Sequence, residues 1–203
     1  ARRAGGQSVS VPQPFIIYLH GFNYSPQSHK ALQLCEAMRQ RGWGSLYACP
    51  ALPTRGSQAI AAVEAELARR PGQPPVFVGS SLGGFYATWL AEKHAGQAVL
   101  INPAITPHLG LRDYLGPQQN LYTGERYELT EEHLRDWQQL HVPAVSPSRY
   151  LLLVETGDEL LDYREAVKRY AGARQIVVEG GDHSLQSFNR HIPLILEFAG
   201  LMD

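Results

Sequence analysis

Short apolar runs alternate with amphipathic stretches along most of this chain. Six runs have the length of buried strands: residues 15–19, 45–48, 76–78, 98–101, 150–154 and 175–178. Between them, apolar residues recur at helical spacing, as at Ala31, Leu34 and Met38. This alternation predicts an α/β protein with a mainly parallel six-stranded sheet and helices on both faces.

Cap residues delimit the predicted helices. Ser25 and Pro26 are typical of an N-cap and of a first helical position, so a helix is expected to begin there. Gly42 is a typical end for that helix. Asp162 has the position of an N-cap before the helix expected at residues 162–170.

Residues 105–148 interrupt the alternation, because they contain no strand-like run. One helix is predicted there, capped by Thr130. A long stretch without strands inside a compact domain usually has a function. We therefore interpret about 105–148 as a small cap inserted into a single domain that spans 15–203. Residues 1–14 are left as an unassigned N-terminal lead.

Composition narrows the possible functions. The 203 residues carry a net charge of −1 without a basic stripe, which argues against nucleic-acid binding. No apolar run is long enough to span a membrane, so no stable membrane insertion is expected. The start of the chain lacks a signal-peptide pattern, and the two cysteines indicate neither a disulfide nor a metal site. We expect a cytoplasmic protein without metal or other cofactor.

The most informative motif lies at residues 79–83, which read Gly-Ser-Ser-Leu-Gly. They fit the pattern G-x-S-x-G and stand between an expected strand and an expected helix. This is the context of a nucleophile elbow, in which a strained turn presents a serine and the glycines avoid clashes with neighbouring elements. Ser81 is therefore the predicted nucleophile. Its neighbour Ser80 occupies a variable position of the motif and is expected to point away from the site.

A nucleophilic serine needs a general base, and that base needs an orienting acid. Asp158 follows the fifth expected strand and His183 follows the sixth. Both therefore stand at the carboxyl ends of parallel strands, where such sheets place their ligands. Their order after Ser81 is also the one typical of this architecture. Asp158 and His183 are the predicted acid and base.

Rival residues have simpler interpretations. Asp182 adjoins the histidine and is expected to form a turn, because sequence neighbours seldom make the required hydrogen bond. His191 precedes a proline away from any strand end. Two backbone donors are expected for an oxyanion: the N–H of Leu82, which follows from the elbow, and that of Phe22, in the loop after the first strand. His20 in that loop is expected to orient it.

Several segments together resemble the YqiA-like esterases, a group of small α/β-hydrolases, over roughly residues 15–201. The matching segments are Tyr-Leu-His-Gly-Phe at 18–22, Ser-Pro at 25–26, Gly-Ser-Ser-Leu-Gly-Gly at 79–84, Asn-Pro-Ala at 102–104, Tyr-Thr-Gly-Glu at 122–125, Thr-Gly-Asp-Glu at 156–159, Leu-Asp-Tyr at 161–163, and Glu-Gly-Gly at 179–181 followed by His183. The resemblance implies a serine esterase or thioesterase, and it places nucleophile, acid and base on Ser81, Asp158 and His183.

We accordingly expect a reduced α/β-hydrolase fold with strand order 2-1-3-4-5-6. The expected substrate is a small-molecule acyl ester or thioester. Candidate pocket residues from the cap are Tyr114, Leu115, Tyr122 and Trp137. Two alternatives stay open: non-ester chemistry on the same fold (carbon–carbon hydrolase, lyase or perhydrolase), and a non-catalytic binding module.

Overall fold

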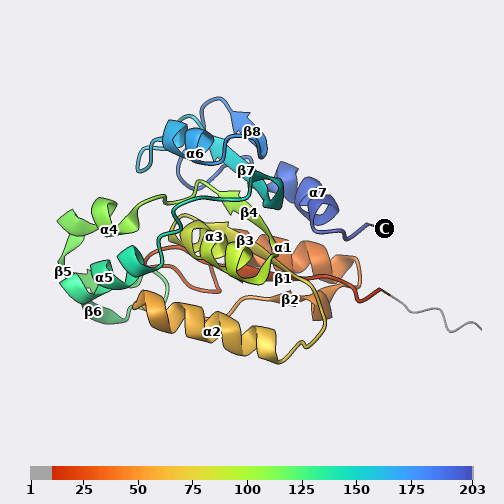
Figure 1. Ribbon diagram of the computed structural model, residues 1–203, viewed down its shortest axis with the longest axis horizontal. Coiled ribbons are helices and arrows are strands. Elements are labelled where there is room, and N and C mark those ends of the chain that lie inside the picture. The colour runs from red at the N-terminus through yellow and green to blue at the C-terminus, as the bar shows by residue number, and fades with distance from the viewer. Residues whose placement is uncertain (1–10, 203) are drawn as a thin grey trace, which may run out of the picture.

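A six-stranded parallel sheet forms the centre of the computed structural model, which describes residues 11–202 (Figure 1). The strands are β1 (Phe15–Leu19), β2 (Tyr47–Ala48), β3 (Pro75–Ser80), β4 (Gln97–Ile101), β7 (Tyr150–Glu155) and β8 (Arg174–Val178). Their order across the sheet is β2-β1-β3-β4-β7-β8, which confirms the predicted fold and strand order. The predicted N-terminal lead lies mostly outside the described residues.

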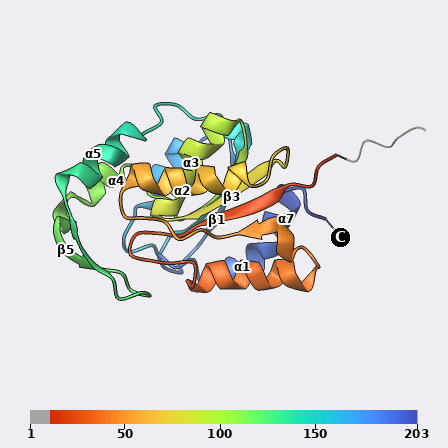
Figure 2. The ribbon, with the colours of Figure 1, turned by 90° about the horizontal axis from the view of Figure 1, so that it is seen from below.

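Helices cover both faces of the sheet, as predicted. Figure 2 shows α1 (His29–Gln40) and α7 (Phe188–Phe198) on one face, and α2 (Gly56–Ala68) and α3 (Leu82–His94) on the other. A short helix, α6 (Tyr163–Arg169), joins β7 to β8. Because both faces are covered, the central strands are mostly apolar, and every residue of β1 and β7 is buried.

One predicted helix start is wrong. Helix α1 begins at His29 with Ser28 as its N-cap, whereas the sequence favoured Ser25. Ser25 instead forms a separate turn, in which its carbonyl accepts from the Ser28 N–H at 3.0 Å and its hydroxyl accepts from the Gln27 N–H at 3.1 Å. The predicted end at Gly42 is confirmed, because this glycine has a positive φ of 75° just beyond the helix.

The connection between β4 and β7, here called the insertion (residues 102–149), lies off the end of the sheet where the strands finish (Figures 1 and 2). It contains α4 (Pro107–Gly110), the 3₁₀ turn η2 (Arg112–Tyr114), the hairpin strands β5 (Gly116–Gln119) and β6 (Arg126–Leu129), α5 (Glu131–Gln139), and the 3₁₀ turn η3 (Pro147–Arg149). The predicted helix after Thr130 is confirmed.

The expectation that this region holds no strand is wrong, because β5 and β6 pair in antiparallel fashion. The first strand reads Gly-Pro-Gln-Gln and has no apolar alternation to reveal it. Long-range contacts support the hairpin instead: the Asn23 amide donates to the Gln118 side chain at 3.1 Å, and the Tyr127 hydroxyl donates to Asn23 Oδ1 at 2.6 Å. The hairpin is therefore attached to the loop that follows β1.

Asp136 attaches the insertion to the sheet domain from another side. Its carboxylate receives two hydrogen bonds from the Arg55 guanidinium, both at 2.9 Å. It also accepts from the Ser57 hydroxyl at 2.8 Å and the Ser57 N–H at 3.2 Å, and so serves the first turn of α2 as a cap from a distant helix.

We expect this carboxylate to stabilise the fold in a pH-dependent way. The hydrogen bonds from Arg55 outweigh burial and lower the pKa of Asp136 from 3.8 to about 2. A lowered pKa adds stability that is present above pH 4 and is lost as the pH falls toward 2, by about 2 kcal/mol in all. Urea unfolding of the native protein and of Asp136→Asn should give free energies that differ at pH 7 and converge in acid. A difference that stays constant with pH would contradict this.

None of the helices within residues 11–202 combines the length and the apolar character needed to cross a bilayer.

Candidate active site

Ser81 occupies a strained turn between β3 and α3. Its φ of 55° is in the left-handed region, which non-glycine residues seldom adopt outside functional sites. The flanking glycines make the turn possible: a Cβ at Gly79 would overlap the backbone of Gly83, and a Cβ at Gly83 would overlap the Leu19 carbonyl. Strand, turn and helix thus meet too closely for any larger residue at these two positions, as the motif predicts.

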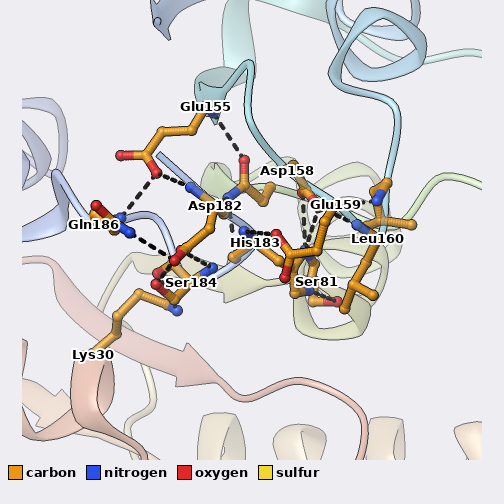
Figure 3. A network of polar contacts seen from close by, with 12 residues as sticks. Lys30, Ser81, Glu155, Asp158, Glu159, Leu160, Asp182, His183, Ser184 and Gln186 are labelled. Atoms are coloured by element: carbon orange, nitrogen blue, oxygen red, sulfur yellow. Dashed lines mark hydrogen bonds and ion pairs between the residues drawn. The ribbon is translucent and has the colours of Figure 1, made fainter. Parts of the chain in front are cut away.

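Three sequence-distant side chains converge at this turn (Figure 3). The Ser81 Oγ lies 3.0 Å from the His183 Nε2. The His183 Nδ1 lies 2.9 Å and 3.0 Å from the two carboxylate oxygens of Asp158. An ionised carboxylate only accepts hydrogen bonds, so Nδ1 carries the proton and Nε2 is left to accept the serine proton. This geometry suits general-base activation of a hydroxyl.

Asp158 is held in its ionised form. Its side chain is only 2% exposed, and burial by itself raises the pKa of the carboxyl. Hydrogen bonds from His183 and from the N–H groups of Leu160 and Leu161, the latter two at 2.9 Å, outweigh burial and lower that pKa below its ordinary value. The carboxylate therefore stays negative at neutral pH and can stabilise a positive imidazole.

A buried carboxylate that sequence reasoning did not single out shapes the loop carrying His183. Glu155, the last residue of β7, is 1% exposed. It accepts from the N–H groups of Asp182 at 2.9 Å, Gln186 at 3.0 Å and Ser187 at 2.8 Å. Burial raises the pKa of Glu155, but hydrogen bonds from Ser187, Asp182 and Gln186 outweigh it and hold the pKa below its ordinary value. The histidine loop therefore wraps around a fixed negative charge.

Asn102 supports the same loop from the end of β4. Its amide nitrogen donates to the carbonyls of Asp182 and His183, both at 3.1 Å, and its oxygen accepts from the Glu155 N–H at 3.1 Å. From the sequence, Asn102 was identified only as part of a segment shared with the resembling family. A polar residue that ends an otherwise apolar strand is the signal that points to both Asn102 and Glu155.

The predicted oxyanion donors lie around the turn. A side chain added at Gly21 would touch the Ser81 Cβ at 3.3 Å, so the loop after β1 runs directly against the serine. Phe22 and Leu82 line the same small cavity. Within residues 11–202, neither of their N–H groups donates to another backbone group. His20 orients this loop, as expected: its Nε2 accepts from the Leu52 N–H at 3.0 Å, and burial lowers the pKa of His20, which favours the neutral ring.

The four pocket candidates occupy different places. Tyr122 lines a cavity of about 350 Å³ beside the site and stacks at a tilt on Tyr24. Tyr114 and Leu115 are exposed, and the Tyr114 ring meets Phe22 edge-on. Trp137 is fully buried and donates from its indole N–H to the Tyr86 hydroxyl at 2.7 Å. The structure therefore brings Tyr122 and Tyr114 to the site loops and places Trp137 in the core beneath Phe22.

The rival residues have structural roles. Asp162 caps α6 by accepting from the Arg164 N–H, and Asp182 forms a turn by accepting from the Ser184 N–H at 2.9 Å. His191 lies within α7 and contacts the Ser187 hydroxyl. Ser80 is buried at the end of β3. The placements of Asp162, Asp182 and His191 agree with the interpretations made from the sequence, whereas Ser80 lines the cavity of about 350 Å³ beside the site.

The described part of the chain, residues 11–202, holds no cluster of three or more metal-ligating side chains. Cys35 and Cys49 are free, and burial raises the pKa of the Cys49 thiol to about 12.

Comparisons with known proteins bear on both fold and family. A family model described as "Uncharacterised protein family (UPF0227)" matches residues 15–200. A candidate hydrolase from Agrobacterium vitis S4 has a similar structure, with a TM-score of 0.75 at 20% identity over 92% of this chain and 88% of that one.

Two further solved structures resemble this one. The mouse alpha/beta hydrolase domain-containing protein 10 has a TM-score of 0.70 at 16% identity over 93% of this chain and 89% of its own. A monoacylglycerol lipase from Paleococcus ferrophilus has a TM-score of 0.64 at 16% identity, covering 95% and 97%. At these identities the likeness shows a shared fold, the α/β-hydrolase fold.

Proposed function

This chain belongs to the UPF0227 family. We propose that it is a serine hydrolase that cleaves acyl esters or thioesters. The family match confirms the resemblance seen in the sequence. The observation that carries the proposal is the contact of the Ser81 hydroxyl with the His183 Nε2 at 3.0 Å, with Asp158 on the opposite ring nitrogen. The activity named for the Paleococcus lipase, which has the same fold, supports an ester substrate.

In the proposed reaction, His183 takes the proton from Ser81 as the serine oxygen attacks the acyl carbonyl. The tetrahedral oxyanion accepts hydrogen bonds from the N–H groups of Phe22 and Leu82, each typically worth about 3 kcal/mol in the transition state. His183 then gives its proton to the leaving alcohol or thiol, and the carbonyl re-forms as an acyl-enzyme. Water, activated by His183, repeats the sequence and releases the acid and free Ser81.

The insertion is proposed to serve as a cap over this reaction centre. Its hairpin is bonded to Asn23, one residue after the oxyanion donor Phe22, and its helix α5 places Trp137 against the Phe22 ring at 6.5 Å between centroids. Anchoring the insertion to this loop allows it to shape the pocket and to keep the Phe22 N–H in position.

Hydrolysis of a p-nitrophenyl ester series from acetate to palmitate tests the proposal. We expect release that depends on chain length in the native protein and disappears in Ser81→Ala. A fluorophosphonate probe should add to the native protein at Ser81. The matched control is Ser80→Ala, which removes the neighbouring serine from the wall of the cavity beside the site, should keep the labelling at Ser81, and should retain a turnover far above that of Ser81→Ala.

The contrary outcomes point to the other interpretations. Equal rates in the native protein and Ser81→Ala, or no hydrolysis at all, would overturn the esterase proposal. Labelling without ester turnover would indicate other chemistry on the same serine. Absence of labelling would indicate a binding module.

A further inference from the structure

The cavity of about 350 Å³ beside the site is lined by neighbours of both residues of the proposed catalytic pair. Gly21, which packs against Ser81, forms one part of its wall, and Ser184, which follows His183, forms another. The first turn of α1 closes the cavity with His29 and Lys30. A substrate whose ester lies at Ser81 can therefore extend into a chamber whose wall includes a lysine.

Lys30 is the cation of this cavity wall, and it is partly buried. Its ammonium donates one hydrogen bond, to the Ser184 carbonyl at 2.7 Å (Figure 3). An ammonium has three donors, so two N–H groups remain. The other polar groups of the wall include the side chains of Tyr24, Gln33 and Asn189, which are neutral.

No carboxylate in residues 11–202 forms an ion pair with Lys30. Two carboxylates, Asp182 and Glu155, act on Lys30 through their charge. Both accept their hydrogen bonds from groups other than Lys30. Asp182 accepts from the Ser184 N–H and hydroxyl and from the Gln186 amide, and Glu155 accepts from three backbone N–H groups. Their negative charges favour the protonated form of the partly buried Lys30 without forming an ion pair with it.

The protonation state of Lys30 agrees with this picture. Burial lowers the pKa of Lys30 to about 8, while the charges of Asp182 and Glu155 act in the opposite direction. The side chain is therefore mostly protonated at neutral pH, and an anion that entered the cavity would meet a positive charge.

We propose that the substrate carries a carboxylate or phosphate group that enters this cavity and pairs with Lys30. The inference rests on the proposed hydrolase function and adds a substrate class to it: esters or thioesters whose acyl or leaving half is anionic. A charge-assisted hydrogen bond of this kind should raise the specificity for an anionic substrate at least about tenfold.

Two matched substrate pairs test the proposal and separate the two halves. The adipate mono-p-nitrophenyl ester is compared with p-nitrophenyl hexanoate, which places a carboxylate on the acyl half. Hexanoyl-coenzyme A is compared with the hexanoyl thioester of N-acetylcysteamine, which places phosphates on the leaving half. The readout is the ratio of kcat/KM for the anionic member to that for the neutral member.

In Lys30→Met this ratio should fall about tenfold or more for at least one pair. Lys30→Arg keeps the charge and should keep most of the preference, and Lys30→Gln provides a second neutral variant should Lys30→Met fold poorly. The control is Lys168→Met, which makes the same charge change on an exposed part of α6 and should leave the ratio within about twofold.

An unchanged ratio in both pairs would overturn the inference and leave the hydrolase proposal intact. If kcat/KM falls by the same factor for both members of a pair, the ratio is unchanged although activity is lost, and this pattern would show that Lys30 only holds the Ser184 loop. If the native protein turns over none of the four compounds, the proposed function fails, and the substrate class fails with it.

Discussion

Replacing His183 with alanine is expected to lower kcat for p-nitrophenyl acetate by about 10⁴-fold or more. The imidazole is the only base in contact with Ser81, at 3.0 Å, among the described residues, so the serine would keep its proton during attack. Adding Ser81→Ala to this variant should cost little more, because residues that act as one unit show non-additive losses. Steady-state kinetics of the two single variants and the double variant provide the measurement.

His191→Ala is the matched control for this experiment. His191 lies late in the chain like His183, but its ring is hydrogen-bonded to the hydroxyl of Ser187, the N-cap of α7. It should retain kcat within about threefold. Losses that multiply in the His183–Ser81 double variant would show that the two residues act separately, which contradicts the proposed mechanism.

Glu155→Gln should have the second largest effect, on stability as well as on activity. The carboxylate accepts three backbone N–H donors from the loop that carries His183, whereas a glutamine offers one oxygen and turns an NH₂ group toward a donor. We expect unfolding to be easier by about 3 kcal/mol and kcat to fall about 100-fold as His183 loses its position. Urea titration and ester hydrolysis measure the two effects.

The control for Glu155 is Glu179→Gln. Glu179 follows the last strand but is exposed, so the same chemical change there should alter stability by less than about 0.5 kcal/mol. If Glu155→Gln behaved like this control in both assays, the histidine loop would be held by its other contacts, with Asn102 as the main candidate.

Local sequence patterns predicted most of the central sheet and the turn at Ser81. Each central strand is mostly a run of apolar residues because both of its faces are covered. Such a run can be recognised in the sequence without knowing which strands pair with it. The turn at Ser81 could also be predicted locally. Its glycines are required because a side chain there would clash within the strand-turn-helix unit or with the adjacent strand. Asp158 and His183 could be placed at one edge because parallel strands end there together.

Other structural features could not be predicted from local sequence patterns. The strand β5 is polar and short, and it is held by Asn23, which lies 95 residues from its partner Gln118. Helix α1 has Ser28 as its N-cap and not the predicted Ser25, because Ser25 forms hydrogen bonds within a separate turn. In each case a competing contact decided between options that the sequence pattern left nearly equal.

The sequence by itself determined the alternation of strands and helices and the strained serine turn, because these depend on residue periodicity and on steric limits around one strand-turn-helix unit. The strand order was expected from the resemblance to a known family and its fold. Only the tertiary structure decided how Glu155 and Asn102 hold the His183 loop and how Lys30 reaches Ser184, 154 residues away. Such contacts depend on where separate elements meet in space, and hydrogen bonds between distant segments follow no period along the chain.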